Sequence, residues 1–164
     1  MPEQLHLSLT GKAGQMALDF VAFADGQSVV FSGPSAAPVT VAANCTQQTL
    51  NTFSAYWCTA VLQPLAAATL YTYKAGSDAA GYSAPFSFTS SVAAPTFAVI
   101  ADYGLGNDES EAQLIADGKS GAFDIIIHAG DFAYNFDDAG SKTGNSFMMT
   151  LQPFAATHPY MPST

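Results

Sequence analysis

The pattern of hydrophobic and polar positions changes after about residue 90. Before it, the chain reads as short stretches of alternating apolar and polar residues separated by glycine and proline; Leu5-His6-Leu7-Ser8-Leu9-Thr10 is typical of a half-buried strand. Seven strands are predicted: Gln4–Thr10, Met16–Phe23, Ser28–Ser32, Val39–Asn44, Ala55–Leu62, Thr69–Lys74 and Phe86–Ser90. Short strands at nearly even spacing are typical of an all-β sandwich.

One segment of this predicted sandwich carries a more specific signal. The order Leu62-x-Pro64-x4-Thr69-x-Tyr71-x-Tyr73 resembles the fibronectin type III pattern, in which a tyrosine beside a corner between strands bonds back to the backbone. Tyr71 would be this tyrosine, with a structural role. His6 falls on the polar side of its strand, which favours a solvated residue over a metal ligand.

The second half has the pattern of an α/β unit. A linker of small residues, Ser90–Pro95, leads into an apolar strand, Thr96–Ala101. The segment Asp108–Glu111 fits a capping box at the start of a helix, and Gly118 is the predicted end of that helix. A second apolar strand, Phe123–His128, completes a βαβ unit, which requires parallel strands and a right-handed crossover.

Candidate chemistry follows directly after these two strands. Asp102 follows the first strand, and Asp131 follows the second, with Tyr134 three residues further on. Because parallel strands present their carboxyl ends at one edge of a sheet, the two carboxylates should converge there. Each aspartate alone is a common turn residue, but two in one βαβ unit with a nearby tyrosine favour a site for a hard cation. His128 lies within the strand, which favours a core histidine over a ligand.

Charge and composition narrow the possible functions. The 164 residues carry a formal net charge of -9, and the only cationic side chains are Lys12, Lys74, Lys119 and Lys142. Nucleic-acid binding, which needs a basic surface, is therefore not expected. A phosphate ligand would need a bound metal for most of its positive charge. No apolar run approaches the roughly 20 residues of a membrane span, and no signal peptide is expected from Met1–Gln4.

Two cysteines leave one question open. Cys45 and Cys58 could form a single disulfide or remain two buried thiols, and their spacing fits either state.

The two post-strand motifs resemble a known family. Asp102-x-Gly104 and Gly130-Asp131-Phe132-Ala133-Tyr134 are similar to the first two metal motifs of the purple acid phosphatases. "PEQLHLSLTG", "LYTYKAG" and "APFSFTS" are similar to strands of that family's N-terminal domain, and residues 147–161 to the helix and strand before its third motif. The resemblance implies a fibronectin type III-like domain at 1–92. It further implies the first βαβ part of an α/β, calcineurin-like metallophosphoesterase domain at 95–164.

The resemblance also implies a chemistry. Asp102 would bind ferric iron, Asp131 would bridge the iron to a divalent metal (Zn, Mn or Fe), and Tyr134 would bind the iron as a phenolate. A phenol with a pKa of about 10 gives up its proton readily only when it coordinates a strongly acidic metal such as ferric iron. The implied activity is that of an acid phosphatase hydrolysing phosphate monoesters, in a secreted, extracellular or vacuolar setting.

The sequence also departs from the family pattern in two places. The third motif, G-N-H-E, should begin within a few residues of His158–Met161 and is not found there, and His158 does not replace its ligands. Asp19-Phe20 stands where the family usually has a small polar residue and a tryptophan. We therefore expect the chain to be the N-terminal portion of a purple acid phosphatase, truncated before that motif and inactive alone.

The alternatives are a non-catalytic recognition or adhesion module with a vestigial phosphatase segment, and a fragment without a function of its own. The apolar partial sheet predicts association with other chains.

Overall fold

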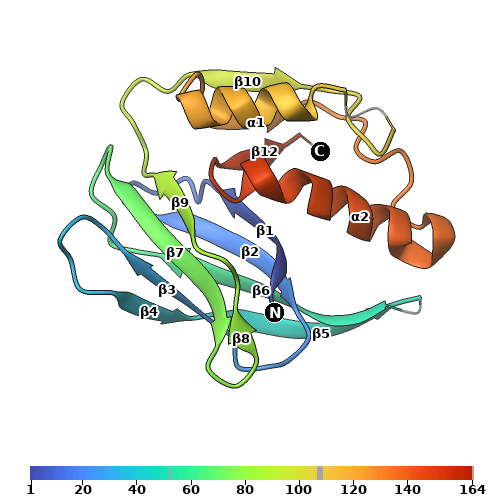
Figure 1. Ribbon diagram of the computed structural model, residues 1–164, viewed down its shortest axis with the longest axis horizontal. Helices are drawn as coiled ribbons and strands as arrows, with labels where there is room; N and C mark the ends of the chain where they lie inside the picture. Colours follow the sequence, from blue (N-terminus) through green and yellow to red (C-terminus); the bar gives the residue numbers. More distant parts are fainter. Residues whose placement is uncertain (52, 107–108, 164) are drawn as a thin grey trace.

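A computed structural model describes residues 1–51, 53–106 and 109–163. Figure 1 shows a two-sheet β-sandwich with a small α/β layer lying against it. The described part of the first 90 residues forms β1 (Glu3–Ser8), β2 (Met16–Ala22), β3 (Ser28–Ser32), β4 (Val39–Ala42), β5 (Asn44–Leu50), β6 (Phe53–Leu62), β7 (Leu70–Ser77), β8 (Gly81–Tyr82) and β9 (Phe86–Thr89).

The sandwich is the predicted fibronectin type III-like fold. One antiparallel sheet has the order β1-β2-β6-β5; the other has the order β4-β3-β7-β8, with β9 also paired to β7. The prediction of seven strands was wrong by two, because β5 and β8 were missed. β5 is a largely exposed, polar strand, so it lacks the alternation that a half-buried strand shows. β8 has only two residues.

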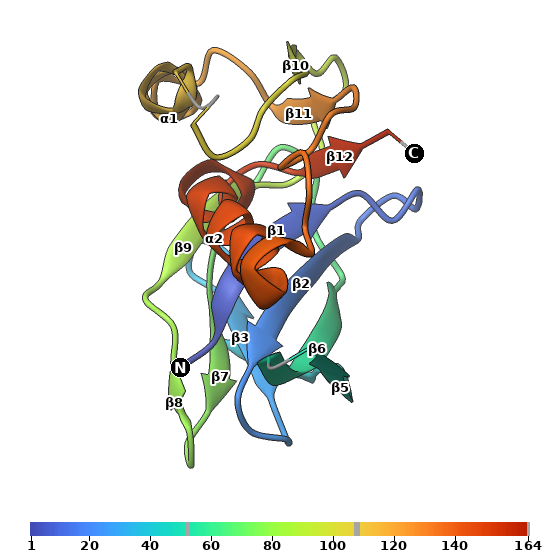
Figure 2. The same ribbon diagram turned by 90° about the vertical axis from the view of Figure 1, so that its right-hand side faces the viewer.

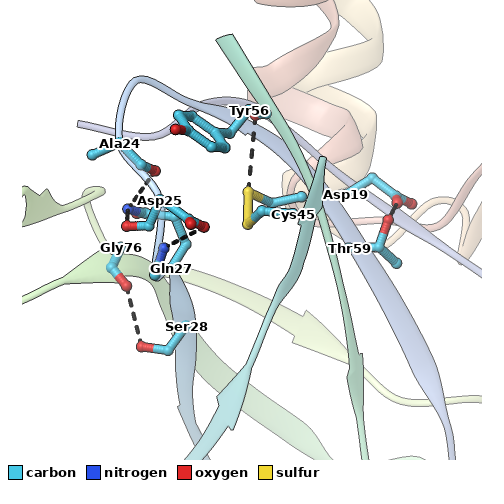
Figure 3. The surroundings of a disulfide bond; sticks show 11 residues. Asp19, Ala24, Asp25, Gln27, Ser28, Cys45, Tyr56, Thr59 and Gly76 are labelled. Atoms are coloured by element: carbon cyan, nitrogen blue, oxygen red, sulfur yellow. Dashed lines mark hydrogen bonds between the residues drawn. A yellow bond between two sulfur atoms is a disulfide. The ribbon is translucent and has the colours of Figure 1, made fainter. Parts of the chain in front are cut away.

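The structure settles one local prediction for the sandwich and one question that the sequence left open. The Ala66 N–H donates a hydrogen bond of 2.9 Å to the Tyr71 hydroxyl, which confirms the structural role predicted for that tyrosine. Cys45 and Cys58 face each other across β5 and β6 and form a disulfide (Figure 3). The disulfide therefore holds an exposed strand against the central strand of its sheet.

The second half forms the predicted parallel sheet. β10 (Phe97–Ile100), β11 (Ile125–His128) and β12 (Tyr160–Pro162) lie in that order, with β10 parallel to β11 and β11 parallel to β12. The crossover helix α1 (Glu111–Ser120) ends later than predicted, because Gly121, with φ 75°, supplies the left-handed cap that had been assigned to Gly118. In the predicted capping box, Asp108 lies outside the described residues.

Helix α2 (Asp138–Ala155) joins the two halves. It begins before the segment 147–161 that resembles the helix and strand of the family, and residues Ala139–Ser141 depart from helical geometry. The helix lies beside β1 (Figure 2), where the Leu5 N–H donates a hydrogen bond of 3.0 Å to Oε1 of Gln152. Just beyond the helix, Ala156 is fully buried among the residues of the sandwich core. The sandwich and the α/β layer therefore share a packed interface.

The parallel sheet has one covered face and one open face. Side chains of β10 and β11 that include Ala98 and Ile126 pack with residues of both helices in a second hydrophobic core. On the opposite face Phe97 is 52% exposed and Val99 is 66% exposed. In the part of the chain that the structure describes, no helix has the length and apolar character needed to cross a bilayer.

Candidate metal centre

Two of the three predicted metal ligands meet at the carboxyl edge of the parallel sheet. The hydroxyl of Tyr134 donates a hydrogen bond of 3.1 Å to Oδ1 of Asp102. Tyr134 is 52% exposed and Asp102 is also exposed, so both oxygen donors are accessible from solvent. Residues 32 positions apart in the chain thus provide a carboxylate and a phenol at one point on the surface.

Backbone pairing between the two loops produces this contact. Beyond the strands, the Ala129 N–H donates to the Ile100 carbonyl at 2.7 Å, and the Ala133 N–H donates to the Tyr103 carbonyl at 3.1 Å. The parallel pairing of β10 and β11 therefore continues past their ends, and the loop that carries Asp131 and Tyr134 runs beside the loop that carries Asp102. Asp131, which is exposed, lies at the same edge through its backbone position.

Gly104 makes room for the tyrosine ring. A Cβ atom at this position would lie 3.0 Å from Cδ2 of Tyr134 and 3.1 Å from Cα of Ala133. Any larger residue would push the ring or its loop away from Asp102. Sequence reasoning assigned no role to this glycine, although its place in the Asp102-x-Gly104 pattern was the available signal.

Four residues at this edge have backbone φ angles that are uncommon for residues other than glycine. Asp102, Asp131, Ala133 and Tyr134 all have positive φ, between 51° and 63°. L-residues adopt this region at a cost, and such strain concentrates at ligand-binding and active sites. The strained residues include all three predicted ligands, which is consistent with a functional edge.

His128 is the core histidine that its position in the strand predicted. It is fully buried, its Nδ1 is hydrogen-bonded to the hydroxyl of Tyr160, and its ring centroid lies 4.4 Å from that of Phe132. Burial lowers the pKa of His128, and hydrogen bonds with the backbone of Gly130 and Asp131 act in the opposite direction. Burial raises the pKa of Tyr160. Both groups are therefore neutral near pH 7, and the ring contact with Phe132 places His128 next to the loop that carries Asp131.

The other two histidines lie away from this edge. His158 lies just before β12 and packs against Phe123, just before β11, with ring centroids 4.9 Å apart. This contact is at the amino ends of the parallel strands, whereas the candidate ligands follow their carboxyl ends. His6 is half-buried on β1 in the sandwich, where its Nδ1 is hydrogen-bonded to the Gln4 carbonyl.

The donor set at the edge fits a hard, acidic metal ion. Carboxylate and phenol oxygens are ligands for such ions, and the 3.1 Å contact shows that Asp102 and Tyr134 can reach one position. Within residues 1–51, 53–106 and 109–163, no three histidine, cysteine, aspartate or glutamate side chains group closely enough to hold a metal ion. Among the described residues the edge therefore brings together one carboxylate and one phenol, and a metal role for them remains a prediction.

By its fold, the protein belongs to the class that combines a fibronectin-like β-sandwich with a parallel α/β sheet. The family model described as "Purple acid Phosphatase, N-terminal domain" matches residues 2–90. The chain belongs to the purple acid phosphatase family, as the sequence motifs indicated.

Similar proteins agree with this assignment. The chain is 33% identical over 170 residues to acid phosphatase type 7 of Mus musculus and 32% identical over 173 residues to that of Homo sapiens, and each alignment covers 98% of the chain. It spans 39% of the length of each of these relatives.

A solved structure shares the fold. The purple acid phosphatase PPD1 isolated from yellow lupin (Lupinus luteus) seeds matches with a TM-score of 0.83 and 19% sequence identity, over 99% of this chain and 34% of that chain. This likeness extends from the sandwich through the parallel sheet.

Proposed function

We propose that the chain forms the sandwich and the iron-binding edge of an acid phosphatase. Asp102 and Tyr134 would bind ferric iron, and Asp131 would bridge the iron to a divalent ion (Zn, Mn or Fe). The contact of 3.1 Å between the Tyr134 hydroxyl and Oδ1 of Asp102 carries the proposal. When bound, the two ions would supply Lewis-acid activation of a phosphate monoester.

In this proposal, residues at and beneath the sheet edge position the tyrosine and the loop. Oδ1 of Asp102 accepts the hydrogen bond of Tyr134 and so holds the phenol beside the carboxylate, where both oxygens would be available to a bound ferric ion. Gly104 leaves the space in which the ring lies. The buried His128 and Tyr160 pair fixes the start of the loop that carries Asp131.

The whole protein would act on phosphate monoesters in an acidic compartment outside the cytosol. The acid phosphatase type 7 relatives support the reaction class. The Cys45–Cys58 disulfide supports the location, because disulfides persist mainly in secreted and other oxidising settings.

The 164-residue chain alone should not hydrolyse p-nitrophenyl phosphate. The proposed ligands provide only part of a two-metal shell, and a net charge of -9 without arginine disfavours the approach of a phosphate dianion. The purified chain would be assayed at acidic pH with iron and either zinc or manganese, beside Asp131→Asn. Metal-dependent turnover that disappears in this variant would contradict the proposed inactivity.

The iron-binding role has a spectroscopic test. Ferric iron added to the chain should produce a visible charge-transfer band from the Tyr134 phenolate. Tyr134→Phe should remove the band, whereas Tyr82→Phe, which alters a half-buried tyrosine on β8, should retain it. A band that persists in Tyr134→Phe would show that another residue is the phenolate, and the proposal would fail.

A further inference from the structure

A second candidate site lies on the outer face of the β1-β2-β6-β5 sheet. A groove of about 470 Å³ separates this face from the N-terminal part of α2 and the segment before it. That volume lies in the range of small-molecule sites. Asp102, Asp131 and Tyr134 are not among the residues that line the groove.

The walls of the groove are aromatic and aliphatic. Trp57 and Phe53 of β6 contribute one wall, with their rings in an edge-to-face arrangement and their centroids 6.0 Å apart. Both side chains are half-buried, so part of their surface remains open. Phe136, 43% exposed, and Met148 contribute the opposite wall. Such rings offer the negative faces that attract organic cations.

Two carboxylates lie at the groove. Strand pairing places Asp19 beside Thr59 on the outer face of the sheet, and Oδ1 of Asp19 accepts a hydrogen bond from the Thr59 hydroxyl (Figure 3). A carboxylate has lone pairs for several further donors. Asp137, which is exposed, lines the groove from the side of α2. Among the described residues that line the groove there is no lysine and a single histidine, His6, so the formal charge of this lining, with histidine neutral, is negative.

The floor of the groove is held in place. The Cys45–Cys58 disulfide ties β5 to β6 (Figure 3), and Cys58 is one of the residues that line the groove. At the far side, Nδ2 of Asn51 donates a hydrogen bond of 2.8 Å to the Ser141 hydroxyl and so connects the β5–β6 turn to α2. A site whose walls are fixed before binding loses little freedom on binding its ligand.

We propose that this groove binds an organic ammonium ion with an apolar body. The cationic head would lie near Asp19 and Asp137, and the apolar part would pack against Phe53 and Trp57. The acidic field of a chain with a net charge of -9 would raise the local concentration of cations and exclude phosphate. This activity is separate from the proposed phosphatase centre.

The sequence provides a direct probe, because Trp57 is the only tryptophan. The full chain would be titrated with benzyltrimethylammonium chloride, at constant ionic strength, while tryptophan fluorescence is followed. Saturable quenching with a Kd on the order of 1 mM is expected for a small ligand of this kind. Benzyl alcohol and benzoate, which lack the positive charge, should bind at least about tenfold more weakly. Added salt should weaken binding of the cation.

Matched variants locate the site. Asp19→Asn and Asp137→Asn should each raise the Kd about threefold, and together about tenfold. Asp78→Asn removes the same charge from an exposed turn outside the groove and should leave the Kd unchanged. Trp57→Leu, followed by calorimetry because the probe is lost, should abolish binding. Thermal melts verify that each variant is folded.

Three outcomes would overturn the proposal. Equal binding of benzyl alcohol and the ammonium ion would show a simple apolar groove. Binding of methyl glucoside in place of the cation would show a carbohydrate site. An unchanged Kd in the Asp19→Asn/Asp137→Asn double variant would place the cation elsewhere. The comparison of charged and neutral probes needs only the unaltered protein, so it decides the matter even if a variant fails to fold.

Discussion

The hydroxyl of Tyr73 donates a hydrogen bond of 2.7 Å to the backbone carbonyl of Ala156 across the interface between the sandwich and the α/β layer. Tyr73 lies on β7 in the sandwich core, and burial raises its pKa, so the phenol remains a donor throughout the physiological range. Ala156, immediately after α2, is also fully buried. The bond therefore lies where water cannot replace either partner.

Replacing this hydroxyl should destabilise the whole chain. Tyr73→Phe keeps the ring but leaves the Ala156 carbonyl buried without its donor, which should lower the free energy of unfolding by about 1–3 kcal/mol. Urea unfolding followed by circular dichroism would measure the change. Tyr82→Phe, at a half-buried position, is the control and should have little effect. Equal stability of the two variants would mean that the interface contributes little.

Gly104→Ala should disturb the candidate iron site without touching a ligand. The added methyl group would meet the Tyr134 ring at 3.0 Å, and crowding of this kind costs about 1–3 kcal/mol. We expect the ring to move away from Asp102 and the ferric band to weaken. Leu105→Ala, at the adjacent exposed position, should keep the band. A band of undiminished intensity in Gly104→Ala would show that the loop accommodates the methyl group.

Stability should fall as the pH drops below about 6.5. Burial lowers the pKa of His158, while a hydrogen bond with the Phe154 backbone and the nearby charge of Asp124 oppose this shift. The unfolded chain, in which a histidine has a pKa of about 6.5, therefore binds more protons than the folded chain. The contribution of neutral His158 is complete above that pH and is lost as the pH falls toward the folded pKa.

The test compares urea unfolding of the wild type and His158→Gln between pH 7.5 and pH 5. The variant should lose less stability than the wild type over this interval, because it lacks the group that takes up the proton. The same pH dependence in both proteins would assign the effect to other groups.

Association through the open face of the parallel sheet stays a prediction. Phe97 and Val99 present exposed apolar surface on β10, which is an edge strand. If this surface drives association, Phe97→Ser/Val99→Ser should reduce the sedimentation coefficient and the binding of a hydrophobic dye. Leu70→Ser, at an exposed leucine of the sandwich, is the matched control. A wild-type chain that sediments as a monomer at all concentrations would disprove the idea.

Sequence patterns predicted the sandwich strands that have one buried face. β1 and β3 alternate between buried and more exposed positions, so their periodicity is visible in the residues. β5 was not predicted from the sequence, because pairing to β6 and the disulfide, rather than burial, hold it in the sheet. No prediction covered the part of α2 before residue 147, where residues 139–141 interrupt the helical geometry.

The candidate site could be anticipated in part. Asp102, Asp131 and Tyr134 follow parallel strands, and sheet geometry brings such positions to one edge. The contact between Asp102 and Tyr134 depends on loop pairing and on the space at Gly104, neither of which has a periodic signal in the sequence. The sequence also does not predict the interface at Ala156, since small apolar residues are common both at helix ends and in cores.

Helix α2 connects the loop that carries Tyr134 to the core of the sandwich. Its first residue follows Tyr134 by four positions, and just past its last residue Ala156 enters the sandwich core. The connection at residues 90–95 is itself tethered, since the Thr69 N–H donates to the Ser90 hydroxyl at 2.9 Å. A substitution in the sandwich core that displaces the end of α2 should therefore also be felt at the loop that carries the tyrosine, with residues 139–141, which depart from helical geometry, as the point where the two could separate.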